Sequence, residues 1–231
     1  TSVFTFQDNT WAIANRGETP RLMRKYEEAL ADFTRAIELD DKMAWAIVGR
    51  GRTYRLMEKY KEALADYTRA IELNEKYVQA FTGRGLTYRE LRKYEEAIAD
   101  FKCAVELDPN DANNIGNYAG LLLCKGFFDE GLILLDKAIK CLPTSDSPGL
   151  AAELWFYAFT HWPTNRKTAL KNLKTVLQSG ERSPVWDLSE NIARARQDGH
   201  SDVDWIEKLA LVITADADIR ELDNWIAWKN V

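Results

Sequence analysis

Residues 60–73 of this chain read YKEALADYTRAIEL, and residues 26–39 read YEEALADFTRAIEL. In the first stretch Ala63, Tyr67 and Ala70 recur at intervals of three or four positions, which is the spacing of one face of an α-helix. The alanines in that stripe let a neighbouring helix approach closely. The two stretches therefore predict a pair of similar amphipathic helices that pack through small residues.

The repetition continues along more than half of the chain. Rows of 34 residues align without a gap over 9–42, 43–76, 77–110 and 111–144, and the first two rows are identical at 23 of 34 positions. Each row holds two helical patterns separated by a short polar turn. The sequence thus predicts an all-α solenoid of antiparallel helix pairs with no sheet. The fixed columns hold small or aromatic residues: Gly17, Gly51 and Gly85; Tyr26, Tyr60 and Tyr94; Ala29, Ala63 and Ala97; and Ala36, Ala70, Ala104 and Ala138.

A recurring glycine and a single proline stand out inside the first predicted helices of the rows. Gly51, which has an equivalent in the rows on either side, costs about 1 kcal/mol of helix propensity, so we expect a neighbouring helix to lie against its bare backbone. Pro20 occupies the column of Tyr54 and Tyr88. Because proline costs roughly 3 kcal/mol or more in a helix interior, the first helix is expected to kink or end near residues 17–19.

The columns resemble the tetratricopeptide repeat, whose rows carry a bulky residue, then Gly or Ala, then Tyr, Ala, an aromatic residue, Ala and finally Pro. The resemblance covers residues 9–144 and implies a right-handed superhelix. Row 111–144 departs from the pattern in its middle, and we interpret it as a repeat that grades into the C-terminal region. The row that matches most fully, 77–110, contributes Phe81, Gly85, Tyr88, Ala97, Phe101, Ala104 and Pro109.

The chain beyond residue 144 keeps helical signals but loses the strict columns. Candidate capping residues and prolines delimit five predicted helices, at 149–162, 166–178, 185–197, 203–215 and 219–228. We interpret them as two degenerate helical pairs and one terminal helix stacked on the solenoid. The predicted domains are therefore an N-terminal extension over 1–8, four repeats over 9–144 and a capping region over 145–231.

Six of the eight tryptophans lie in that capping region. One interpretation is that their large rings fill gaps between irregular helices and close the open end of the stack, as every solenoid requires. The alternative is an exposed aromatic patch for a partner, because tryptophan is enriched at binding hot spots. Trp225 and Trp228 are the expected exposed pair in that case, since they stand near the end of the sequence.

Composition limits the classes of function. A formal net charge of -5 and a pI near 5.3 argue against a protein that neutralises nucleic-acid phosphates. No apolar run reaches the roughly 18 residues of a membrane span, and the first residues carry no secretory signal pattern, so we expect a cytoplasmic protein. Cys103, Cys124 and Cys141 lack the paired spacing of a zinc or redox site. We expect reduced cysteines and neither metal nor cofactor.

Catalytic patterns are not found in the sequence. The two histidines, His161 and His200, fall in different predicted helical pairs and in no metal-ligand or nucleophile motif. Asp66, Asp100 and Glu72 are expected to face solvent or to pair with basic residues at helical spacing. We therefore expect a protein that is not an enzyme.

The resemblance implies that the first helices of successive repeats line a concave binding groove. Arginine suits carboxylates through its planar donor fork, so an acidic or C-terminal peptide is the expected ligand class; the alternative is that the arginines pair with Glu and Asp of adjacent repeats. Gly83 stands where family members that hold a chaperone's terminal carboxylates require an arginine, which argues against such a clamp. The groove columns transfer to Trp11, Arg21, Trp45, Arg52, Arg55, Gln79, Thr82, Arg89 and Asn113.

Three classes of function remain at this point. The leading one is a scaffold that binds a protein or peptide, including the sensor or adaptor part of a longer signalling protein. Single-stranded RNA binding is compatible with the tryptophan and arginine columns but not with the acidic total charge. An enzyme with an unrecognised site has no convergent acid, base or metal group in its favour.

Overall fold

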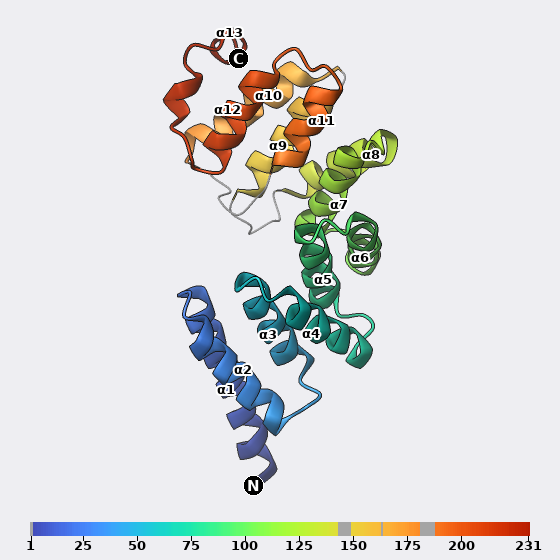
Figure 1. The fold of residues 1–231 in the computed structure, drawn as a ribbon, viewed down its shortest axis with the longest axis vertical. Helices are drawn as coiled ribbons and strands as arrows, with labels where there is room; N and C mark the ends of the chain where they lie inside the picture. Colours follow the sequence, from blue (N-terminus) through green and yellow to red (C-terminus); the bar gives the residue numbers. More distant parts are fainter. Residues whose placement is uncertain (1, 143–148, 163, 181–187) are drawn as a thin grey trace. The chain divides into compact units, whose positions relative to one another are not determined.

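The computed structural model describes residues 2–142, 149–162, 164–180 and 188–231, and every regular element in these ranges is a helix (Figure 1). The predicted all-α class, with antiparallel helix pairs and no strand in the described residues, is confirmed. The chain forms two compact units, Thr1–Asp108 and Pro109–Val231. The first unit contains three helix pairs: α1 (Ser2–Leu22) with α2 (Tyr26–Leu39), α3 (Ala44–Leu56) with α4 (Tyr60–Leu73), and α5 (Val78–Glu90) with α6 (Tyr94–Leu107).

The same backbone turn reverses the chain direction within each of these pairs. Arg24, Glu58 and Arg92 occupy the same column and adopt left-handed conformations, with φ of 59°, 59° and 58°. The next amide then turns back onto the first helix, and the N–H of Lys59 donates to the carbonyl of Tyr54 at 2.9 Å. Left-handed residues end many helices in this way, usually with glycine. The short polar turn that recurs in every row is therefore a helix C-cap.

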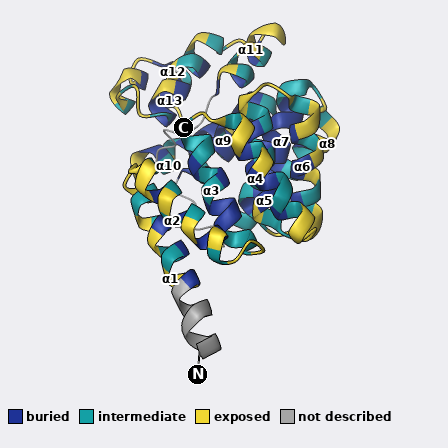
Figure 2. Cartoon of the chain, turned by 60° about the horizontal axis from the view of Figure 1, so that its bottom comes forward, coloured by how far each residue is buried: buried dark blue, intermediate teal, exposed yellow. Residues whose placement is uncertain are grey.

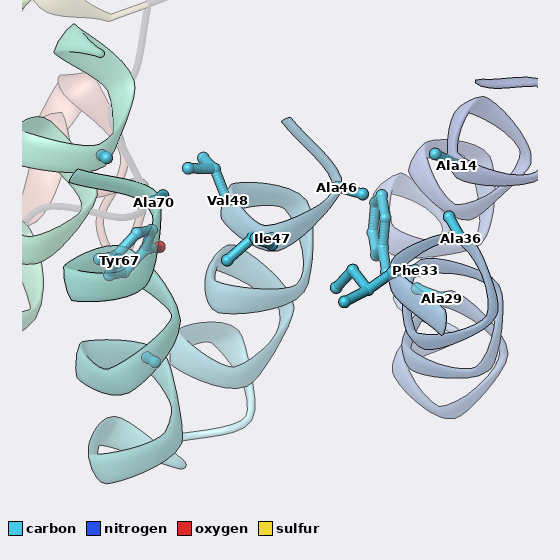
Figure 3. Packing of buried hydrophobic residues seen from close by; sticks show 12 residues of the cluster. Ala14, Ala29, Phe33, Ala36, Ala46, Ile47, Val48, Tyr67 and Ala70 are labelled. Atoms are coloured by element: carbon cyan, nitrogen blue, oxygen red, sulfur yellow. The ribbon is translucent and has the colours of Figure 1, made fainter. Parts of the chain in front are cut away.

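A single aromatic ring forms the centre of each repeat in the first unit. Phe33 of α2 extends toward α3 and lies beside Ala46 (Figure 3), and its side chain is completely buried. A Cβ added at Gly17 would approach the Phe33 ring to 3.2 Å, and one at Gly49 would approach it to 2.5 Å. The ring thus contacts bare backbone in its own pair and in the next pair. Tyr67 repeats the arrangement between Gly51 and Gly83, which confirms the packing role expected of the helical glycines.

Figure 2 shows how burial follows from this stacking. The outer face of α2 is exposed, while α3, which packs between neighbouring pairs, presents mostly buried and intermediate residues. Burial of the alanine and aromatic stripe removes apolar surface from water at about 25 cal/mol per Å². The stability of this unit therefore comes mainly from close contact between helices.

The buried aspartates correct one expectation. Asp66 is only 6% exposed and accepts two hydrogen bonds from the Arg50 guanidinium, at 2.7 and 2.8 Å. Arg84 holds Asp100 in the same way. Each partner lies 16 residues away on the facing antiparallel helix, because the two helices of a pair bring these columns together. Glu72 is exposed, as expected.

One of the two outcomes expected for Pro20, an end of the helix near residues 17–19, was wrong. α1 continues through Pro20 and ends at Leu22, with Pro20 in its last turn. The proline removes only one amide donor there, and its carbonyl still accepts the turn-closing bond from the N–H of Lys25 at 2.8 Å. Since the helix ends within two residues, the ring interrupts little of the hydrogen-bond ladder. α1 also begins at Ser2, within the segment expected to precede the first repeat.

The second unit starts with a regular pair and continues with shorter helices. α7 (Ala112–Lys125) packs on α8 (Phe128–Cys141), and α9 (Leu150–His161) packs on α10 (Arg166–Gln178). The chain ends with a 3₁₀ turn, Ile219–Leu222, and a short α13, Ile226–Lys229, where one helix over 219–228 was expected. That expectation was wrong because Asp223 and Asn224 form a turn, closed by the N–H of Trp225 on the carbonyl of Leu222. Between these parts lie α11 (Ser189–Gln197) and α12 (Val203–Ile213).

The C-terminal tryptophans lie inside this unit. Trp225 and Trp228 are each 3% exposed, so the expectation of an exposed pair was wrong. Trp225 stacks in parallel on Trp205 at 5.5 Å between centroids and on Trp228 at 6.5 Å, and it meets the edge of Phe159 at 5.7 Å. The rings cover one another because the terminal segment folds back, so that α13 packs on α10 and Trp225 reaches Trp205 of α12. Trp186 lies outside the described residues.

Candidate peptide-binding groove

A cavity of about 190 Å³ opens between the first helices of the first unit. α1 contributes Glu18, α3 contributes most of the wall, and the start of α5 closes the far side. The cavity brings together three residues of the sequence-predicted site, which come from two different repeats. The complete lining is Glu18, Trp45, Val48, Gly49, Arg52, Tyr77 and Gln79.

The apolar part of the wall is held rigidly. Trp45 is partly buried and meets the Phe33 ring edge-on, with centroids 6.1 Å apart. Tyr77 packs partly buried against the same core. Because both rings are anchored by the repeat core, they present fixed apolar faces to the cavity. Rigid aromatic surfaces of this kind bind at low cost in conformational entropy.

Arg52 is the cation of the cavity. None of the residues that the structure describes forms an ion pair with it. Burial raises the pKa of the Tyr77 phenol, the Arg52 charge lowers it and the Glu18 charge raises it, so both charges act on this ring. An ionised guanidinium with unused donors beside aromatic rings suits a planar carboxylate.

Two of the predicted groove arginines have intramolecular partners. Arg21 donates to the Glu18 carboxylate at 2.6 and 3.0 Å. Arg55 donates to Glu90, in the next repeat, at 2.5 Å. Burial opposes the charge on Arg55, but Glu90 and Tyr67 outweigh burial and raise its pKa. The alternative considered from the sequence, pairing with acidic residues of adjacent repeats, therefore describes Arg55, whereas Arg21 pairs within its own helix.

The remaining predicted residues lie in different surroundings. Trp11 is 63% exposed on α1 and does not line the cavity. Thr82 donates its hydroxyl proton back to the Val78 carbonyl at 3.0 Å. Arg89 is half-buried in the last turn of α5. Asn113 belongs to the second unit, where its main-chain N–H donates to the capping carboxylate of Asp111.

Comparison with known proteins agrees with the repeat register. The Tetratricopeptide repeat family pattern matches residues 44–77 and 78–111. The chain belongs to the tetratricopeptide repeat family. No curated protein sequence matches the chain.

Solved structures of other tetratricopeptide repeat proteins share the fold. The crystal structure of MamA has a TM-score of 0.58 at 16% identity and covers 71% of this chain and 94% of its own. That of YrrB, described as having an unusual peptide-binding site, has a TM-score of 0.52 at 21% identity and covers 88% and 86%. The second TPR domain of human RPAP3, solved with the HSP70 peptide SGPTIEEVD, is 30% identical, covers 50% and 97%, and has a TM-score of 0.47.

Packing explains why this tetratricopeptide repeat chain departs from the carboxylate clamp at position 83. A Cβ at Gly83 would lie 2.4 Å from the Tyr67 ring, which is completely buried. A side chain there would displace the ring at the centre of the preceding repeat. The glycine therefore belongs to the repeat core, and no arginine fits at this column.

Sequence reasoning missed Glu18, Val48, Gly49 and Tyr77 as cavity residues. Glu18 stands in the column of Arg52, so the register already contained a signal: one groove column carries opposite charges in neighbouring repeats. Val48 shares the column of Thr82 and could have been found in the same way. Tyr77 precedes α5, and only the folded turn brings its ring to the cavity.

The described ranges contain neither a membrane-spanning helix nor a cluster of metal-ligating side chains. No helix there is both long enough and apolar enough to cross a membrane. No group of three or more His, Cys, Asp or Glu residues in the same ranges is arranged to hold a metal ion. The cysteines Cys103, Cys124 and Cys141 are distributed over α6, α7 and α8 and form no disulfide.

Proposed function

We propose that the first unit binds an extended peptide segment of a partner protein in the groove between α1, α3 and α5. The observation that carries the proposal is the cavity in which Arg52, without an ion-pair partner among the described residues, lies with the anchored rings of Trp45 and Tyr77. Peptide binding is stated of YrrB and of RPAP3 by their descriptions. For this chain, the proposal rests on the side chains that line its own cavity.

The charges of the groove favour a segment with one acidic side chain. Arg21 and Arg55 are engaged by Glu18 and Glu90, and Arg52 is the predicted groove arginine that lines the cavity, so it is the donor for a ligand carboxylate. A second negative charge on the ligand would meet no further cation in the cavity lining. We therefore expect a single Glu or Asp at the centre of the bound segment, in contrast to a densely acidic tail.

The apolar wall defines a second requirement. A volume of about 190 Å³ admits one or two side chains, and the indole of Trp45 favours an apolar or aromatic neighbour. Gln79, exposed at the rim, can exchange hydrogen bonds with the peptide main chain. The proposed ligand is thus an acidic residue next to an apolar one, within a partner that this scaffold recruits.

The experiment compares paired peptides that differ only by Glu and Gln next to an apolar residue. Arg52→Gln is expected to weaken binding of the Glu peptide by about tenfold, the value of one charge-assisted hydrogen bond, and to leave the Gln peptide unaffected. Arg35→Gln is the matched control, because Arg35 is exposed on the outer helix α2. Affinities are measured by fluorescence anisotropy.

Equal binding of the Glu and Gln peptides by the unaltered chain would contradict an acidic ligand. Equal affinity of Arg52→Gln and Arg35→Gln would move the site away from this cavity. A titration with single-stranded poly-uridine at increasing salt provides the RNA control, since phosphate contacts weaken steeply with salt. Salt-sensitive binding of that oligonucleotide together with no peptide binding would replace the proposal with an RNA-binding function.

A further inference from the structure

The second unit contains a larger cavity, of about 530 Å³, that is unrelated to the groove. Four segments enclose it: the start of α8, the end of α9, the start of α10, and the end of α11 with the loop that follows. It gathers both histidines of the chain, which the sequence had placed in separate helical pairs. The lining consists of Phe128, Leu132, Thr160, His161, Arg166, Ala195, Asp198, Gly199, His200 and Ser201.

Both imidazoles have a buried nitrogen that meets no hydrogen-bond partner in the described residues. Nε2 of His161 and Nε2 of His200 are each inaccessible to solvent and lack such a partner at hydrogen-bond geometry, although the Phe159 carbonyl lies near His200. Nδ1 of His200 accepts from the N–H of Asp202 at 3.1 Å, so the proton of the neutral ring is on Nε2. A buried donor without an acceptor costs about 1–3 kcal/mol, which a ligand oxygen would recover.

The charges around the cavity leave one cation available. Asp198 accepts from Arg194 at 2.9 Å, and Arg194 also lies over the Phe128 ring at 4.8 Å. Arg166 is exposed and forms no ion pair with any described residue. The guanidinium of Arg166 is therefore the cationic group that a ligand can reach.

The titration of the histidines agrees with this geometry. Burial lowers the pKa of His161 to about 4; Asp198 opposes the shift, and Arg194, His200 and Arg166 add to it. Burial, and then Arg166, lower the pKa of His200, while Asp202 and the nearby Phe159 carbonyl oppose them. Both rings are neutral at pH 7, and a negative charge entering the cavity would raise both pKa values.

We propose that this cavity binds a carboxylate carried on a short apolar stem. The guanidinium of Arg166 and the Nε2 atoms of His161 and His200 receive the carboxylate, and Phe128 and Leu132 contact the stem. The carboxylates of Asp198 and Asp202 disfavour a doubly charged phosphate, so a single negative charge suits the site best. Binding takes up a proton at one imidazole when the pH is mildly acidic.

Butyrate and its neutral analogue butyramide are the probes, and the full chain is the sample. Because the chain has two histidines, the imidazole Cε1–H region of an NMR spectrum reports both rings separately. Butyrate is expected to shift both signals in a saturable way, and butyramide to bind at least about tenfold more weakly. Butyrate affinity is expected to rise as the pH is lowered from about 7 to about 5.5.

Arg166→Gln is the decisive variant, since an exposed residue can be replaced without disturbing the core. It is expected to weaken butyrate binding by about tenfold, whereas Lys167→Gln, one exposed residue further along α10, is expected to leave it unchanged. Equal effects of the two variants, or equal affinities for butyrate and butyramide, would overturn the proposal. Arg52→Gln is expected to leave butyrate binding intact, which separates this result from the groove.

The source of the carboxylate is tested with a short peptide that ends in a free carboxylate and with the same peptide as its amide. Binding of the free acid alone assigns the cavity to a protein terminus. Binding of butyrate but of neither peptide assigns it to a small carboxylic acid. Both outcomes support a carboxylate site, and the absence of binding by butyrate and by the free-acid peptide rejects it.

Discussion

Phe33, Tyr67 and Phe101 hold the same column of three successive repeats, and each is completely buried. The described residues of the second unit contain no such series. There Leu135 stands in the column of Phe101, and the rings that build its core, such as Trp225, come from outside the register. In the first unit a contact in one repeat predicts the same contact in the next, whereas each contact of the second unit is formed once.

The polar contacts differ in the same way. The first unit repeats an arginine–aspartate pair across each helix pair, as in Arg50–Asp66. The column of Arg50 holds Tyr118 in the second unit, whose hydroxyl donates to Glu130 at 2.8 Å. The comparison indicates that regular repeats leave a cavity between their first helices, while irregular packing encloses a cavity lined by the two histidines inside the second unit.

The largest expected effect tests the stacked tryptophans. Trp225→Ala should destabilise the second unit by about 3–5 kcal/mol, because a buried indole is removed from between Trp205 and Trp228. Hydrogen exchange should show faster amide exchange in α9, α10 and α12, with little change in α3 and α4. Equal loss of protection in both units would contradict the separation between them.

The next effect tests the repeated ion pair. Asp66→Ala should destabilise the first unit by about 2 kcal/mol, since it leaves the largely buried Arg50 charge without its partner. Asp32→Ala is the internal comparison, because the side chain of its partner Arg16 is 69% exposed and that of Arg50 is 17% exposed. Urea unfolding followed by circular dichroism should give the smaller loss for Asp32→Ala. A reversed order would show that burial does not determine the value of the pair.

The third effect is a pH dependence confined to the second unit. The pKa of His161 is about 4 in the folded chain against an ordinary value of 6.5, so the unfolded state binds the proton more tightly. Stability is therefore complete above pH 6.5 and is lost as the pH falls toward 4, by roughly 2 kcal/mol at pH 5. His161→Gln should remove this part of the dependence. Parallel pH profiles for the two proteins in urea unfolding would disprove the assignment.

The sequence by itself determined the fold class, the repeat length and the packing role of the glycines. A register of 34 residues places the same residue type at the same position of several rows. Helix periodicity and small residues therefore identify the same helix–helix interface in each repeat. Three cavity residues, Trp45, Arg52 and Gln79, followed from the resemblance to the tetratricopeptide repeat, whose groove columns the 34-residue register transfers to this chain.

Only the tertiary structure decided which charged side chains pair with one another and whether the C-terminal tryptophans are buried. The partners of Arg21 and Arg55 depend on which carboxylate reaches a guanidinium in space, and Glu90 lies 35 residues from Arg55. Trp225 and Trp228 are near the end of the sequence but inside the unit, because the terminal segment folds back over α10. Contacts of this kind join segments that share no sequence period, so no pattern along the chain specifies them. The packing of the helices determines which rings are buried and where the histidine cavity forms.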